Sequence, residues 1–138
     1  MTQEQKDLLL KDICTRLPYG VKGKVSRCDS NNRECEFVAT IDGKLYDRFA
    51  VFQESWYDNV IIKPYLFPLS SMTDEQYNEF FTYFHEAEKK EIETSGDYLK
   101  AAYLGENAKR DWLNKNHFDY HYLIPLGLAN DATGLNIY

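Results

Sequence analysis

The spacing of apolar residues changes twice along the chain, and this change constrains the fold more than any other feature. Apolar side chains recur at the helical period over 9–17, alternate with the period of two typical of strands over 20–62, and return to the helical period over 77–87. Helical and strand segments that are separated in this way favour an α+β fold. With 138 residues, the chain is expected to form a single domain over 1–138.

Capping boxes mark the starts of two helices. Thr2 with Gln5, and Thr73 with Gln76, each place a hydroxyl three residues before a glutamine, the arrangement that satisfies two backbone N–H groups at a helix start. Pro18 ends the first helix. The predicted helices are 2–17, 73–92, 97–104 and 107–117, with a further short helix between 117 and 128.

The strand segments predict an antiparallel meander, because short turns join them. At Asp42-Gly43 the register is open. A two-residue loop pairs Ile41 with Lys44, whereas a loop one residue longer gives a cleaner apolar face and is favoured on burial grounds. Two prolines within 63–69 predict an extended strap that interrupts any ladder. The predicted strands are 21–28, 34–41, 44–52 and 57–63.

From these segments we expect an N-terminal helix, a meander of three to four antiparallel strands, and a helical C-terminal half packed on one face of the sheet. Aromatic residues are numerous: 8 Phe, 11 Tyr and 2 Trp make up 15% of the chain. Some of these aromatic residues are expected to lie in the core, with tyrosines at its edge. The others are available to bind a partner, since Tyr and Trp anchor many interfaces.

The formal net charge of −6 is concentrated in one segment. Residues 73–97 carry eight acidic side chains against Lys89 and Lys90, and the rest of the chain is balanced. Nucleic-acid binders normally show a net basic face, so we expect no nucleic-acid partner. The acidic face of the 73–92 helix is either a solubilising surface or a docking site for a basic partner.

No motif for nucleotide binding or serine catalysis is present, and no apolar run is long enough to span a membrane. We therefore expect a cytoplasmic protein without a cofactor. The densest set of reactive side chains lies in 111–121. There His117, Asp119 and His121 provide residue types that bind zinc, although the H-E-x-x-H pattern is absent. A metal-dependent hydrolase is thus an alternative function, while no bound metal is the expectation.

Three parts of the sequence resemble a family of short, uncharacterised proteins of gut anaerobic bacteria, often encoded in prophages or other mobile elements. They are LLLKDICTRLPYGV at 8–21, KPYLFPLSSMT at 63–73, and DWLN at 111–114 with HFDY at 117–120 and GLA at 127–129. The resemblance implies a cytoplasmic accessory protein and assigns no catalytic residues. Arginine is usual in the family where this chain has His121, which weakens the metal hypothesis.

The leading functional prediction is a small, non-enzymatic accessory protein that binds another protein through an aromatic surface. Besides the metal-dependent hydrolase, an acidic DNA mimic that uses Glu86, Glu88 and Glu91 is a further alternative. The residues predicted to contact the partner are Tyr65, Phe67, Trp112, His117 and Tyr120.

Overall fold

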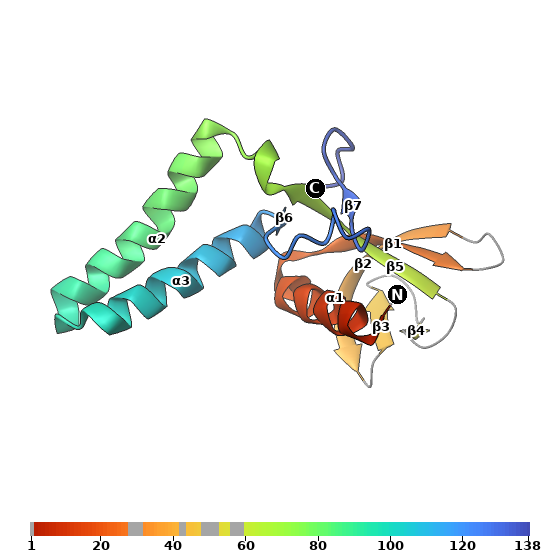
Figure 1. Ribbon diagram of the computed structural model, residues 1–138, viewed down its shortest axis with the longest axis horizontal. Helices are drawn as coiled ribbons and strands as arrows, with labels where there is room; N and C mark the ends of the chain where they lie inside the picture. Colours follow the sequence, from red (N-terminus) through yellow and green to blue (C-terminus); the bar gives the residue numbers. More distant parts are fainter. Residues whose placement is uncertain (1, 28–31, 42–43, 48–52, 56–59) are drawn as a thin grey trace.

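The computed structural model in Figure 1 describes residues 2–27, 32–41, 44–47, 53–55 and 60–138. It confirms the α+β class, with an N-terminal helix, a sheet and two long C-terminal helices. The helices are α1 (Gln3–Arg16), α2 (Asp74–Ser95) and α3 (Tyr98–Lys115), with short 3-10 turns η1 (Leu17–Tyr19) and η2 (Leu69–Ser71). The strands are β1 (Lys22–Arg27), β2 (Asn32–Ile41), β3 (Lys44–Asp47), β4 (Gln53–Ser55), β5 (Val60–Pro68), β6 (Phe118–Asp119) and β7 (Asn130–Asp131).

The sheet is mixed, so the prediction of a purely antiparallel meander is wrong. Strands β1 to β4 do pair antiparallel in sequence order, but β5 pairs with the far side of β1, giving the order β4-β3-β2-β1-β5-β6. Strands β6 and β7 then run parallel to β5. Parallel pairing needs a long crossover, and the two helices between β5 and β6 provide it.

The register of the β2–β3 hairpin corresponds to the shorter loop, so the longer loop favoured above is wrong. Ile41 pairs with Lys44, while residues 42–43 themselves lie outside the described residues. The burial argument assumed a regular ladder, but the register shifts between Phe37 and Ala39. Such an irregularity changes the phase of the strand, so Phe37 is buried without a longer loop.

The proline-containing strap is the second half of β5. The β1–β5 ladder ends at its first proline, as predicted, but its second proline takes part in the short β5–β6 ladder, contrary to the prediction. Pro64 pairs with Gly23 at the last position of the β1–β5 ladder, and Pro68 pairs with Asp119 of β6. A proline lacks only its own N–H group and is tolerated where a ladder ends or lies at an edge. The predicted parts 48–52 and 57–59 of two strands fall outside the described residues.

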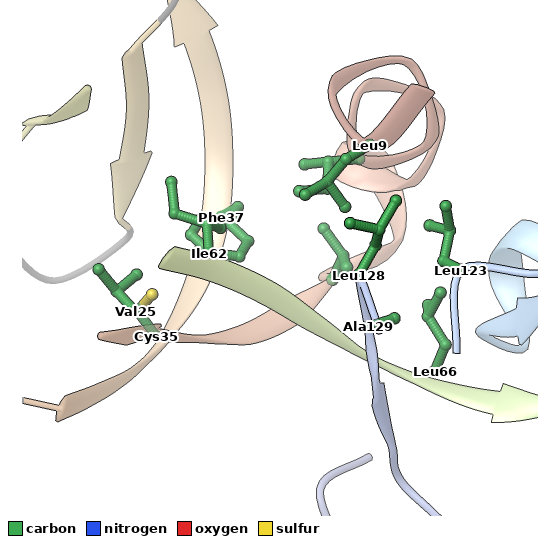
Figure 2. Close-up of a cluster of buried hydrophobic side chains, with 11 residues drawn as sticks. Leu9, Val25, Cys35, Phe37, Ile62, Leu66, Leu123, Leu128 and Ala129 are labelled. Atoms are coloured by element: carbon green, nitrogen blue, oxygen red, sulfur yellow. The ribbon is translucent and has the colours of Figure 1, made fainter. Parts of the chain in front are cut away.

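The core lies between α1 and the sheet. Figure 2 shows Leu9 of α1, Leu66 of β5 and Leu128 of the C-terminal segment meeting over the sheet. Leu9 and Leu66 are fully buried, and the helical spacing of the first segment predicts the burial of Leu9. The cluster comprises Leu9, Ile13, Val21, Val25, Cys35, Phe37, Ile62, Leu66, Leu123, Leu128 and Ala129.

Replacing Gly23 with alanine is expected to destabilise the sheet by about 1–3 kcal/mol, the usual cost of overpacking. A Cβ atom at this position in β1 would lie 2.5 Å from Cε2 of Phe37 and 2.9 Å from the backbone oxygen of Lys63. Urea unfolding measures the effect. The substitution should cost less in a Phe37→Leu background, and equal costs in both backgrounds would show that the Phe37 ring is not the obstacle.

The helical half does not pack on one face of the sheet, which corrects the prediction. Helices α2 and α3 form an antiparallel hairpin that extends away from the sheet (Figure 1), and α2 contains no buried residue. Its apolar stripe packs against α3 instead, with the ring of Phe80 5.4 Å from that of Trp112 between centroids. It is α1 that covers the core.

Helix α3 is continuous, so the predicted break at Gly105 is also wrong. Gly105 is buried because the side chain of Glu88 from α2 lies across it, where a Cβ atom would clash. The glycine therefore allows the two helices to approach and does not end one. The short helix predicted between 117 and 128 is absent from this fully described segment, which contains β6 followed by turns.

Candidate interaction surface

The α2–α3 hairpin exposes a set of large side chains along both of its helices. The aromatic members are between 46% and 72% exposed, and the leucine is 86% exposed. Contiguous exposed apolar side chains can mark an interaction site, so this set on one projecting element is the candidate site. We call this set the hairpin surface; it consists of Tyr77, Phe81, Tyr83, Tyr98, Leu99 and Tyr103.

The packing between the two helices explains why these rings are left over. On α3 the stripe that faces α2 consists mainly of small residues, with Ala101, Gly105 and Ala108 buried at helical spacing before Trp112. Leu99 and Tyr103 lie four residues apart and off this stripe, so they face away from α2. The sequence could have predicted this exposed face, because the small-residue stripe and the Leu99–Tyr103 pair occupy different faces of one continuous helix.

Polar contacts hold the hairpin together along its length. The Lys100 ammonium contacts a Glu91 carboxylate oxygen at 2.9 Å, and that hydrogen bond lowers the pKa of Glu91 and raises the pKa of Lys100. The Lys109 ammonium lies 4.5 Å from the centre of the Phe84 ring, a cation–π contact. Glu88 and Glu91 are therefore engaged within the hairpin and are not simply part of a solvated acidic face.

A shallow cleft of about 640 Å³ runs along α2 and is here called the α2 cleft. Three carboxylates and the exposed Tyr83 ring give it an acidic and aromatic character. Burial raises the pKa of Tyr19 of η1, and electrostatic interactions with Asp111 and Tyr83 add to that shift. The residues lining the α2 cleft are Glu75, Asn78, Glu79, Thr82, Tyr83, Glu86 and Trp112.

The residues predicted to contact a partner mostly lie inside the joint between the hairpin and the sheet. Tyr65, Trp112 and His117 are 6%, 6% and 7% exposed, and Phe67 and Tyr120 are half-buried. Phe67 and Tyr120 pack with Trp112 in one aromatic cluster that also contains Phe118. The prediction that these five residues bind a partner stays a prediction, and five of the exposed aromatic rings lie instead on the hairpin surface.

Three of the five, Tyr65, Phe67 and His117, contact Tyr138. The His117 ring stacks on the Tyr138 ring, with centroids 3.5 Å apart. The Tyr138 hydroxyl donates to the backbone oxygen of Tyr65 at 2.8 Å and accepts from the backbone N–H of Lys22 at 2.9 Å. Burial raises the pKa of Tyr138 to about 12 and lowers the pKa of His117 to about 4. These contacts fix the C-terminal segment to the sheet.

The three side chains of the metal hypothesis point to different partners. His117 stacks on Tyr138, and the Asp119 carboxylate accepts hydrogen bonds from the backbone N–H groups of Leu123 and Ile124. His121 contacts Asp12 instead. Across the part of the chain that the structure describes, no three His, Cys, Asp or Glu side chains are grouped to hold a metal ion. This geometry gives the metal-dependent hydrolase no support.

A buried ionic cluster joins α1 to the segment after α3. The Asp12 carboxylate accepts from Arg16 Nε at 2.8 Å and contacts His121 Nδ1 at 2.8 Å, while Arg16 Nη2 donates to the backbone oxygen of Phe118 at 2.7 Å. Burial alone would raise the pKa of Asp12, but the hydrogen bonds from His121 and Arg16 outweigh it and lower that pKa. Asp12 and Arg16 are fully buried, so the cluster has a structural role.

The fold and the hairpin surface define an α+β domain that carries a projecting helical hairpin. Comparison of the chain with protein-family models, with curated proteins and with solved structures found no match in any of the three. The resemblance to proteins of mobile elements therefore stays a prediction. Among the described residues, no helix is long and apolar enough to cross a membrane.

Proposed function

We propose that this protein is a non-enzymatic interaction module whose α2–α3 hairpin binds a protein with a basic surface. The observation that carries the proposal is the hairpin surface itself, six large side chains that remain exposed on an element extending away from the core. Exposed Tyr and Phe rings are typical anchors of binding sites. The resemblance adds the proposal that the protein acts in the cytoplasm as an accessory product of a mobile element.

The charge distribution supports a partner with a basic surface. The whole net charge of −6 arises in residues 73–97, a segment that includes all of α2. In the α2 cleft the carboxylates of Glu75, Glu79 and Glu86 surround Tyr83. A partner that presents Lys or Arg side chains would pair with these carboxylates and stack its cations on the tyrosine ring. A second copy of this acidic surface would be repelled.

The acidic DNA mimic is a narrower form of the same proposal, in which the partner is a nucleic-acid-binding protein. Glu88 and Glu91 are engaged within the hairpin, so reversing them would damage the fold as well as the surface. The carboxylates that line the α2 cleft, Glu75, Glu79 and Glu86, are the better set to reverse. Competition between double-stranded DNA and this protein for the captured partner distinguishes the two forms.

The partner can be isolated through a photoreactive residue placed at position 83 and identified in an extract of the source cells. Tyr83→Asn is then expected to weaken binding of the purified partner by about tenfold or more, because truncating an interface anchor costs more than 1 kcal/mol. Affinity should also fall as salt is raised. Isothermal titration calorimetry measures both effects.

Tyr122→Asn is the matched control, since this tyrosine is 66% exposed but lies outside the hairpin. The control should bind the partner as tightly as the unchanged protein does. Equal losses for the two variants, or a captured protein with an acidic binding surface, would contradict the proposed function. A dimer of this protein that forms through position 83 would contradict it as well.

A further inference from the structure

A second cleft lies between the end of α1 with η1 and the outer face of α3, and we call it the η1 cleft. Its volume of about 590 Å³ falls within the range of small-molecule sites. The proposed function makes no use of it. The η1 cleft is lined by Cys14, Thr15, Pro18, Tyr19, Asn107, Arg110, Asp111, Asn114 and Tyr120.

Asn114 presents an unused hydrogen-bond donor in this cleft. Its side chain is one of few buried polar groups, with 5% of the residue exposed. The amide oxygen accepts from the Tyr120 hydroxyl at 2.8 Å and faces the Thr15 hydroxyl at 3.4 Å. The amide nitrogen has no hydrogen-bond partner among the described residues. The buried atoms without a partner are Arg16 Nη1 and His117 Nδ1, so the Asn114 nitrogen keeps some contact with solvent. It therefore opens to the cleft that Asn114 lines.

Contacts with Tyr120, which itself packs on Arg16, fix the orientation of the Asn114 amide. The Tyr120 ring packs over the guanidinium group of Arg16, with 5.2 Å between Cζ and the ring centre, and Arg16 is held by Asp12. In the structure the Tyr120 hydroxyl donates to the amide oxygen, and in this orientation the NH₂ group is the end that faces outward. A rigid support of this kind is what a binding group needs to be pre-organised.

Arg110 supplies a positive charge one helical turn away. Residues four apart on a helix have Cβ atoms about 5–6 Å apart, so the Arg110 guanidinium and the Asn114 amide can reach the same ligand atoms. Arg110 uses one N–H group on the Asn107 oxygen at 3.3 Å, which leaves donors for a ligand. Asp111 adds a carboxylate to the same cleft, so the cleft holds one positive and one negative group.

We propose that the η1 cleft binds a small monocarboxylate. The ligand carboxylate accepts hydrogen bonds from the Asn114 amide and the Arg110 guanidinium, and its apolar part lies against Pro18 and Tyr19. A guanidinium group pairs with a carboxylate through two parallel bonds. A doubly charged phosphate ester fits less well, because the Asp111 carboxylate and the acidic α2 helix repel the second charge.

Nuclear magnetic resonance titration of the ¹⁵N-labelled full chain tests the proposal, with sodium benzoate as the probe. Benzoate should shift the Asn114 side-chain amide and the Arg110 backbone amide to saturation. Benzamide, its neutral analogue, should not, and phenyl phosphate should bind more weakly. Arg110→Gln should weaken benzoate binding by about tenfold, the effect expected for losing a charge-assisted pair. Asn114→Asp should abolish it, because an acceptor replaces the donor.

Lys115→Gln is the control, since it removes one positive charge from the exposed face of the same helix outside the cleft. It should leave benzoate binding unchanged. Arg110 is exposed, so its substitution leaves the fold intact and the comparison remains decisive even if Asn114→Asp unfolds. The proposal is overturned if benzoate gives no saturable shifts, if benzamide or phenyl phosphate binds as well, or if Arg110→Gln has no larger effect than the control.

Discussion

Replacing Asp12 with alanine is expected to lower the free energy of unfolding by about 3–5 kcal/mol, the cost of leaving one member of a buried ion pair without its partner. Asp12 and Arg16 are both fully buried, and the Arg16 guanidinium already has one nitrogen, Nη1, without a partner. Without the carboxylate, a positive charge would remain inside the protein with the backbone oxygen of Phe118 and the Tyr120 ring as its remaining partners. Urea unfolding, followed by circular dichroism, measures the loss.

The double variant Asp12→Leu with Arg16→Met is the matched control. It removes both charges and keeps apolar volume in their place, so it should be more stable than the Asp12→Ala variant. If alanine at position 12 costs less than about 1 kcal/mol, the pair is hydrated in solution and does not join α1 to the β6 segment. If the double variant is less stable than Asp12→Ala, the expectation that an unpaired Arg16 charge is the main cost of Asp12→Ala is wrong.

Stability is expected to fall as the pH is lowered from about 6.5 to 4, and His117 is the cause. Burial, followed by the charges of Arg16 and Lys22, lowers the pKa of His117 to about 4 from 6.5. Between these values the unfolded chain binds a proton that the folded chain does not bind, so acid favours unfolding. The full loss is about 3 kcal/mol, since each pKa unit corresponds to about 1.4 kcal/mol.

Asp12 extends the acid sensitivity to lower pH. Its folded pKa lies below 3.8, so the stabilisation it provides is present above that value and is lost as the pH falls through the folded pKa. His117→Asn separates the two effects, because asparagine accepts the left-handed backbone at φ 62° but does not titrate. Unfolding free energies measured across the pH range should lose the slope between 6.5 and 4 in this variant. An unchanged slope would exclude His117 as its source.

Local features of the fold could be predicted from the sequence because they depend on neighbouring residues. Both capping boxes form, with Thr2 and Thr73 accepting from the backbone N–H groups of Gln5 and Gln76 at 3.2 Å. The start of the first helix and its buried Leu9 follow from the same local pattern. The order of β1 to β4 can also be predicted, since strands joined by short turns usually pair with each other.

The errors concern contacts between distant parts of the chain. The apolar stripe of α2 indicated a buried face, but sequence could not show that α3, and not the sheet, would cover it. Gly105 looked like a helix end because its neighbour Glu88 lies 17 positions away in the sequence. Residue type predicts Trp112 and Tyr65 as contacts, and only the packing shows that they are buried.

The most direct test of the proposed function is hydroxyl-radical footprinting of the protein alone and bound to its partner. In the free protein we predict rapid oxidation of Tyr83, Tyr98 and Tyr103 and slow oxidation of Tyr65 and Phe118, in line with their exposure. Binding should protect the hairpin rings and leave Tyr122 unchanged. Hairpin rings that are already protected in the free protein, or that remain reactive in the complex, would contradict the account.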